Sequence, residues 1–139
     1  MKILGNVIMF DRLEKLEENY TQLEKFKESV SLNDVLQNKT DEWALRYGLF
    51  ESIQIIIDIS CHLVSKYNLG NPKTYIDCID LLVQNNYLDS KLGEKLNGMI
   101  GLRNILIHEY VKIDLDKLYQ LLNSINDFKE FAVSVKDKI

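Results

Sequence analysis

The chain has 139 residues, 46% of them hydrophobic, so it can bury one good core but is too short for two ordinary domains, and we expect a single domain over residues 1–139. A formal net charge of −4 excludes a general basic surface for neutralising phosphates; any RNA contact must be local, and no DNA partner is expected. The N-terminus lacks the pattern of a signal peptide and no apolar run reaches the roughly 18–20 residues of a membrane span, so we expect a cytoplasmic protein without a membrane partner.

The first half of the chain is dominated by helical periodicity. Residues 6–29 carry apolar side chains at intervals of three and four, which predicts an amphipathic helix. Ser31-Leu32-Asn33-Asp34 has the pattern of a capped helix start, and this short helix should fade at Asn38. The longest helix is expected from about residue 40 to 67, with one broad apolar face. Its other face gathers polar side chains, namely Tyr47, Glu51, Asp58, His62 and Ser65.

Three further helices are expected in the second half. Asn71-Pro72 predicts a helix start and a helix ending near Gln84, and Asp89-Ser90 predicts the next, which ends near Glu109. Asp114 should cap the last helix, whose apolar face extends to Val135. No sustained alternation with a period of two supports strands. The fold class is therefore all-α, an up-and-down bundle of about five helices with the short ones beside a four-helix core.

The two cysteines and the acidic and histidine residues give little support for a metal or another cofactor. Cys61 and Cys78 lack metal-ligand spacing, and two cysteines in a chain of this size are not a disulfide scaffold, which fits a reducing cytoplasm. Cys61 and His62 are adjacent in a helix and point apart, so they are not a nucleophile–base pair. Asp58 and His62 have helical spacing, but two ligands do not make a metal site.

Arg103 breaks the pattern of the helix that follows Ser90, because it lies near the middle of the apolar arc. A guanidinium there must be paired with a carboxylate, be fully hydrogen-bonded, or face an interface or cleft. Taken alone, a structural ion pair is the simpler explanation, as a solvated face is for the polar stripe of the long helix. We expect a carboxylate of that stripe, Asp58 before Glu51, to lie near Arg103.

The opposite arc of the same helix is small and polar. It carries Gly93, Asn97, Gly101, Asn104 and His108, and we expect it to form part of a homodimer interface. Arg103 and His108 are five positions apart, about 140° around a regular helix. Both side chains can therefore approach one phosphate only if the helix end distorts or a second subunit contributes.

An arginine and a histidine together have the capacities that RNA cleavage without a metal requires. A base with a pKa near neutrality takes the 2′-hydroxyl proton, and a cation stabilises the charged phosphorus in the transition state. Each residue also has a plainer explanation: His108 lies near a helix end, where it can bond the last carbonyls, and Tyr110 can be a core aromatic with a wet tip.

The stretch from Arg103 to Tyr110, Arg-Asn-Ile-Leu-Ile-His-Glu-Tyr, resembles the R-N-x-L-x-H-x-Y signature of the HEPN superfamily, in particular of HepT-like toxins. The segment Ile-Asp-Ile-Ser-Cys-His-Leu around Asp58 is similar to the family's long helix. The resemblance implies a HEPN-like four-helix core and a homodimeric, metal-independent endoribonuclease toxin of a type VII toxin–antitoxin system, with its motif at the dimer cleft.

The same resemblance implies a partner and a role for each motif residue. The partner is a minimal nucleotidyltransferase antitoxin that attaches AMP to the motif tyrosine. Arg103 and His108 would be catalytic, Asn104 would support the site, and Tyr110 would be modified. The alternative is a non-catalytic helical subunit that binds a nucleotide or pairs with a nucleotidyltransferase. The acidic charge favours this alternative slightly, and the intact motif favours the ribonuclease more.

Overall fold

The computed structural model describes residues 2–108 and 112–139, and all regular elements in those two ranges are helical. The long helices are α1 (Lys2–Ser29), α3 (Lys39–Lys66), α5 (Ser90–Leu106) and α7 (Ile125–Val135). The short elements are α2 (Leu32–Gln37), α4 (Tyr75–Gln84) and α6 (Leu115–Gln120), with 3₁₀ segments η1 (Leu121–Ser124) and η2 (Lys136–Lys138). The predicted all-α class is confirmed.

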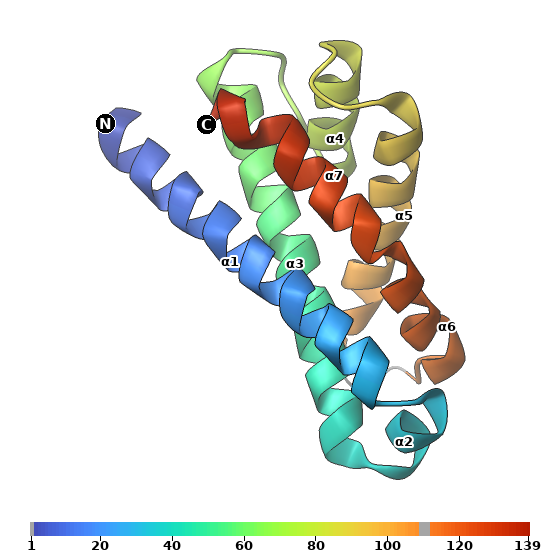
Figure 1. Cartoon of the computed structure of the whole chain (residues 1–139). Coiled ribbons are helices and arrows are strands. Elements are labelled where there is room, and N and C mark those ends of the chain that lie inside the picture. The colour runs from blue at the N-terminus through green and yellow to red at the C-terminus, as the bar shows by residue number, and fades with distance from the viewer. Residues whose placement is uncertain (1, 109–111) are drawn as a thin grey trace.

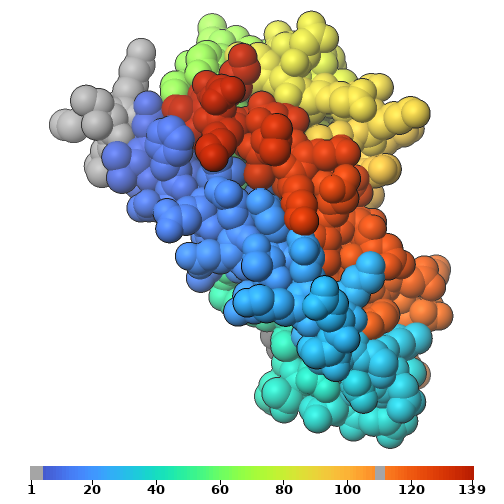
Figure 2. All heavy atoms as spheres, in the orientation of Figure 1, coloured from blue at the N-terminus to red at the C-terminus, as the bar shows by residue number. Residues whose placement is uncertain are grey.

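Helix α3 lies at the centre of the bundle and packs against α1, α4, α5 and α7 (Figure 1). Helix α2 turns the chain between α1 and α3 at one end, and α4 and α5 form a pair beside α3. In Figure 2, the side chains of α1 and α7 cover the visible face of α3, which emerges mainly at its two ends. At the far end from α2, the Lys66 Nζ donates to Asn6 Oδ1 (3.2 Å) and Tyr67 Oη donates to the Lys138 carbonyl (2.5 Å), which ties α1, α3 and η2 together.

The predicted apolar face of α3 supplies much of the core. Its side chains are almost completely buried, among them Leu45, Leu49, Ile53, Ile56 and Leu63. Each such burial contributes about 1.5–3 kcal/mol relative to an exposed side chain. Helix α3 is long and apolar enough to cross a membrane by length and composition, but 56% of its most apolar window is buried inside the protein, as in the core helix of a soluble protein.

Two of the predicted helix starts are confirmed by their hydrogen bonds. Ser31 and Asp34 form a reciprocal capping box at α2, and the Asp114 side chain accepts from Asp116 N and Lys117 N at α6. Asn38, where the short helix was expected to fade, also caps α3, because its Oδ1 accepts from Thr40 N and Asp41 N. Such a cap is typically worth about 1 kcal/mol.

Helix α4 begins three residues later than Asn71-Pro72 predicts. Thr74 is its N-cap and forms a capping box with Asp77, whose carboxylate also accepts from Lys73 N at 2.8 Å. The backbone bond from Lys73 is the main cause that lowers the pKa of Asp77, assisted by the bonds from Thr74. The capping box gives hydrogen-bond acceptors to backbone N–H groups at the helix start that have no partner within the helix, and a proline supplies no such acceptor. The predicted start at Pro72 was therefore wrong.

The last predicted helix is interrupted, and the one before it ends early. The 3₁₀ turn η1 separates α6 from α7. Residues three apart lie on the same side of a 3₁₀ turn, and Leu122 and Ile125, which have this spacing, are both buried. Helix α5 ends at Leu106 rather than near Glu109, which lies outside the described residues.

Two of the five residues predicted for dimer contact are used inside the chain. A Cβ added to Gly93 would lie 2.5 Å from Val83 Cγ2, so this glycine permits the close approach of α4 and α5. Asn97 Nδ2 donates to Asp80 Oδ1 of α4 at 2.9 Å. The prediction was therefore wrong for these two residues, whereas Gly101, Asn104 and His108 are exposed.

Two glycines of α5 provide a matched test of this packing. Gly98→Ala should raise the free energy of unfolding by about 1 kcal/mol, because alanine is the better helix former and nothing lies within 4 Å of the added Cβ. Gly93→Ala gains the same propensity but overpacks against Val83, which typically costs about 1–3 kcal/mol, so it should be less stable than Gly98→Ala. Urea unfolding of both variants measures the difference. Equal stabilisation by both would show that α4 and α5 are not in close contact.

Candidate active site

The end of α5 changes shape just before His108. Ile107 N donates to Arg103 O at 3.2 Å across four residues, and His108 N donates to Ile105 O at 3.1 Å across three. The helix thus tightens and stops, and His108 lies beyond its last residue with an exposed side chain. The angular separation of about 140° applies only to a continued regular helix. Because α5 ends before His108, that separation does not fix how the two side chains lie relative to each other.

The Arg103 guanidinium is held by hydrogen bonds to neutral side chains. Its Nε and Nη2 donate to Gln54 Oε1 at 2.9 and 2.5 Å, and Nη1 donates to Asn104 Oδ1 at 3.2 Å. A guanidinium has five N–H donors. With these described partners, one N–H on each terminal nitrogen remains, and an arginine N–H forms a strong charge-assisted hydrogen bond with a phosphate oxygen.

Two aromatic rings stack against the same guanidinium. Its Cζ lies 5.4 Å from the ring centre of Phe50 on α3 and 5.4 Å from that of Tyr75 on α4. Cation–π contacts of this kind contribute about 0.5–1 kcal/mol each where solvent reaches them. Arg103 is therefore fixed by three helices: by Asn104 on its own helix, by Gln54 and Phe50 on α3, and by Tyr75 on α4.

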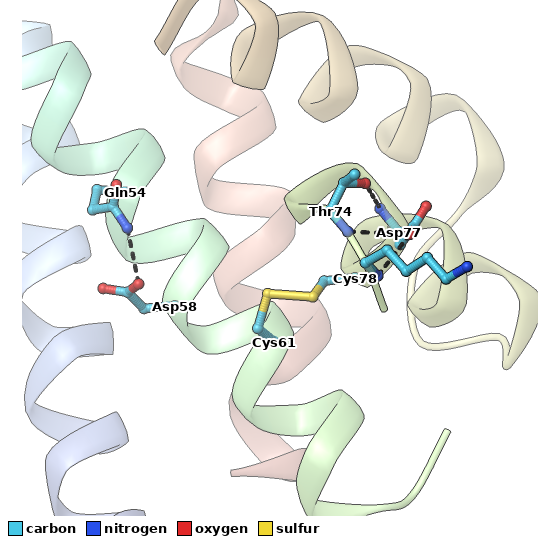
Figure 3. The surroundings of a disulfide bond; sticks show 7 residues. Gln54, Asp58, Cys61, Thr74, Asp77 and Cys78 are labelled. Carbon is cyan, nitrogen blue, oxygen red and sulfur yellow. Dashed lines mark hydrogen bonds between the residues drawn. A yellow bond between two sulfur atoms is a disulfide. The ribbon is translucent and has the colours of Figure 1, made fainter. Parts of the chain in front are cut away.

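The predicted carboxylate partners of Arg103 are engaged elsewhere, so a direct ion pair was the wrong expectation. Asp58 Oδ2 pairs with Arg12 Nη1 at 2.7 Å. The other carboxylate oxygen accepts from Gln54 Nε2 at 2.9 Å, the bond drawn in Figure 3. An amide in this position accepts from Arg103 with its oxygen and donates to Asp58 with its nitrogen. The result is a continuous polar chain from Arg103 through Gln54 and Asp58 to Arg12, which joins α5, α3 and α1.

Glu51 lies on the same stripe but turns towards α1. It accepts from Asn19 Nδ2 at 2.9 Å and from the Tyr47 hydroxyl, and Lys15 Nζ lies 3.9 Å away. Burial alone would raise the pKa of Glu51, but the hydrogen bonds from Tyr47 and Asn19, with Lys15, lower it overall. The hydrogen bond between the Tyr47 hydroxyl and Glu51 raises the pKa of Tyr47.

His62, the other histidine of the chain, is not placed to act as a solvent-exposed general acid or base. Its Nε2 is buried, with no hydrogen-bond partner among the described residues. Burial first, and Lys66 second, lower its pKa. No group of three or more His, Cys, Asp and Glu side chains in residues 2–108 and 112–139 is arranged to hold a metal ion.

Cys61 of α3 and Cys78 of α4 form a disulfide beside the site (Figure 3). Their Cα atoms are 5.1 Å apart, and the bond ties α4, which carries Tyr75, to the helix that carries Gln54. The sequence analysis missed this pair, because a separation of 17 residues does not reveal which faces of two helices meet. It is a single link between two helices and not a disulfide scaffold.

Two grooves flank Arg103. The first, of about 770 Å³, lies between the N-terminal half of α3 and the end of α5, and includes Trp43, Tyr47, Phe50 and Ile107. The second, of about 650 Å³, lies between the start of α4 and α5 and is lined in part by Tyr75, Ile100 and Asn104. Phe50 and Tyr75, the rings that stack on Arg103, belong one to each groove.

Gln54 should position Arg103 for catalysis. We expect Gln54→Leu to lower RNA cleavage by about 10- to 100-fold, mainly in kcat, because a small displacement of a catalytic group has effects of this size. Gln54→Glu keeps an acceptor for Arg103 and should retain more activity. Glu51→Gln, on the same helix but bonded to α1, is the control and should stay near wild type. Equal rates for Gln54→Leu and Glu51→Gln would contradict this role.

An all-α bundle with a fixed arginine just before a helix end and a histidine just after it defines a helical ribonuclease of the HEPN class. The chain belongs to the ribonuclease HepT-like family, and the model of that family matches residues 16–135. It is 28% identical to the mRNA nuclease HepT of Shewanella oneidensis, over 89% of this chain and 87% of that one. It is 31% identical to the tRNA nuclease HepT of Aphanizomenon flos-aquae, over 84% of this chain and 79% of that one.

Solved structures of similar proteins have the same fold as this chain. The tri-AMPylated Shewanella oneidensis HEPN toxin in complex with its MNT antitoxin superposes with a TM-score of 0.84 at 26% identity, covering 94% of this chain and 97% of that one. A toxin–antitoxin complex with AMP-PNP has a TM-score of 0.85 at 25% identity, with 94% and 98% covered. The family predicted from the motif, and the enzyme class of RNA endonuclease, are confirmed.

Proposed function

We propose that this protein is a metal-independent endoribonuclease toxin in which Arg103 and His108 carry out the chemistry. The observation that carries the proposal is the fixed guanidinium of Arg103. It contacts the rings of Phe50 and Tyr75 and is hydrogen-bonded to Gln54 and Asn104, with two N–H groups left, on a helix that stops before His108. Such a preorganised cation costs no reorganisation when charge develops at the phosphate.

The proposed reaction cleaves the RNA backbone by internal transfer. The imidazole of His108 takes the proton of a 2′-hydroxyl, and the 2′ oxygen attacks the adjacent phosphorus. The bond from phosphorus to the 5′ oxygen of the next nucleotide breaks, and that oxygen acquires a proton. The products are a 2′,3′-cyclic phosphate and a 5′-hydroxyl. Arg103 stabilises the negative charge on the phosphoryl oxygens throughout.

A nucleotidyltransferase antitoxin is the proposed partner of this chain. The support is that similar structures are toxin–antitoxin complexes, one of them with a tri-AMPylated toxin. Tyr110, the motif tyrosine, lies outside the described residues, and we propose it as the AMP acceptor. A phosphodiester charge and a bulky nucleotide next to His108 would hinder the entry of RNA. We also propose a cytoplasmic location, where both RNA and a nucleotidyltransferase are present.

A homodimer is proposed through the exposed end of α5. Gly101, Asn104 and His108 are exposed there, next to Ile105 and Ile107, which are each 45% exposed although apolar. A second copy at this end would bring a second Arg103–His108 pair into one cleft. Light scattering of an active preparation at micromolar concentration should give the mass of a dimer, and a monomer would contradict this arrangement.

The test of the proposed function is an RNA cleavage assay in the presence of EDTA. Wild-type protein should cut single-stranded RNA and leave 2′,3′-cyclic phosphate ends. Activity lost with EDTA and restored by magnesium would overturn the metal-independent mechanism. Uncut RNA together with stable binding of the nucleotidyltransferase would instead identify the chain as a non-catalytic subunit.

A further inference from the structure

The two grooves beside Arg103 share unusual chemistry, because exposed aromatic rings line both. Trp43 and Tyr47 in the first groove are 61% and 65% exposed, and Tyr75 in the second is 45% exposed. Large aromatic side chains normally bury most of their surface. Rings held at the surface beside a candidate phosphate-binding arginine are available to stack on the bases of a nucleic acid.

The charge along the grooves is opposite to that of the whole chain. The first groove is lined by Lys39, Arg46 and one carboxylate, Glu42, and the second by Lys73. Three cations and one carboxylate therefore line the grooves, whereas the chain as a whole has 17 basic and 21 acidic residues. Glu42 pairs with Lys39 at 3.2 Å and with Arg46 at 2.9 Å, and Lys73 has no carboxylate among the residues that line its groove. A local excess of positive charge in an acidic protein is complementary to a phosphate backbone.

Arg103 links the two grooves through its ring contacts. Its guanidinium lies 5.4 Å from the ring centre of Phe50, which lines the first groove, and 5.4 Å from that of Tyr75, which lines the second. Asn104, which accepts from Arg103, also lines the second groove. A phosphate at the two remaining N–H groups would therefore have a nucleotide in each groove.

We propose that the two grooves form one binding track for single-stranded RNA, in which a base stacks on Trp43 on one side of the scissile phosphate and another stacks on Tyr75 on the other side. The inference rests on the proposed ribonuclease function and adds the part of the protein that selects the substrate. Stacking accepts every base but requires it to be unpaired, so the track favours single strands over duplexes with little sequence preference.

A second copy of the chain is the other candidate occupant, because Ile107 and Asn104, at the proposed dimer end of α5, also line the grooves. Tryptophan and arginine are enriched at protein interfaces, but lysine and glutamate are depleted there, and the lysine and glutamate of the first groove favour RNA. Here Lys39, Arg46 and Glu42 share a groove with the exposed ring of Trp43. Rings interleaved with cations are the composition of a single-strand binding surface.

The experiment uses Trp43, the single tryptophan of the chain, as its own reporter. Full-length His108→Ala protein, which should bind RNA without cutting it, is titrated with a single-stranded oligonucleotide and with the matching duplex. Single-stranded RNA should quench the tryptophan fluorescence and the duplex should not. Fluorescence that changes with protein dilution, and not with RNA, would overturn the proposal in favour of a second copy in the groove.

Affinities of labelled single-stranded RNA complete the test in the same background. Trp43→Ala and Tyr75→Ala should each weaken binding by about 5- to 150-fold, the range expected when one stacked base loses its partner. Tyr75→Phe keeps the ring and should bind as the parent does. Phe10→Ala removes an exposed aromatic that lines neither groove and is the matched control.

The outcomes separate this inference from the proposed function. Unchanged affinity in both Trp43→Ala and Tyr75→Ala, with circular dichroism showing both to be folded, would overturn the track even if wild-type protein cleaves RNA. Selective loss of binding in these two variants supports the track even if wild-type protein leaves the bound RNA intact, in which case the proposed function fails alone.

Discussion

His108→Ala is expected to reduce RNA cleavage by about 10²–10⁴-fold, the usual contribution of a general acid–base group. His108 lies beyond the last residue of α5, and its side chain is exposed, so its removal leaves no cavity in the core. The far-ultraviolet circular dichroism and the unfolding midpoint should therefore match wild type. Single-turnover cleavage of a labelled single-stranded RNA in EDTA measures the effect.

The other histidine is the control for this prediction. His62 has a buried Nε2 and a pKa lowered by burial and by Lys66, so it does not supply an exposed base. His62→Gln should retain cleavage at close to the wild-type rate when assayed well below its unfolding temperature. A normal cleavage rate for His108→Ala, together with a large loss of rate for His62→Gln, would assign the catalytic role to His62 and refute the proposed mechanism.

Periodicity and caps were sufficient to predict most of the helices. The stripe of α3 that includes Leu45 and Ile53 is buried as expected, and the caps at Ser31 and Asp114 are present. The misplaced start of α4 followed from giving Pro72 more weight than the Thr74–Asp77 box, although both signals are in the sequence. Local hydrogen bonding decides such boundaries, and propensity is only a weak guide to them.

The partner of Arg103 was missed because the argument assumed that a charge requires an opposite charge. Gln54 lies on the same stripe as Glu51 and Asp58, and its i,i+4 spacing to Asp58 was a usable signal. A neutral amide serves here because it accepts from Arg103 and donates to a carboxylate that Arg12 already neutralises. The two stacking rings come from separate helices, and only the packed structure brings them together.

The glycines of α5 illustrate the same limit. A small-residue face permits close approach, but the sequence does not say whether the approaching backbone belongs to the same chain. Gly93 meets Val83 of α4, whereas no atom lies within 4 Å of a Cβ built on Gly101. Register between helices, which depends on the connecting turn, determines this difference, and it also determines the meeting of Cys61 and Cys78.

Tyr110→Phe should cleave RNA nearly as well as wild type and yet escape inactivation by the cognate nucleotidyltransferase and ATP. The reason is chemical, because a phenylalanine ring has no hydroxyl to accept AMP, while proton transfer and charge stabilisation are assigned to His108 and Arg103. Helix α5 ends at Leu106, and Tyr110 lies outside the described residues.

The measurement preincubates each protein with the antitoxin and ATP, removes the antitoxin and then assays RNA cleavage. Wild-type protein should lose its activity and gain the mass of AMP on the peptide that contains Tyr110, whereas Tyr110→Phe should keep both its activity and its mass. Tyr119→Phe is the matched control, since the Tyr119 hydroxyl donates to the Val30 carbonyl at 2.5 Å and is not free to accept AMP; it should be silenced like wild type. Silencing of Tyr110→Phe, or AMP found on another residue, would refute the regulatory role of Tyr110 and leave the ribonuclease assignment intact.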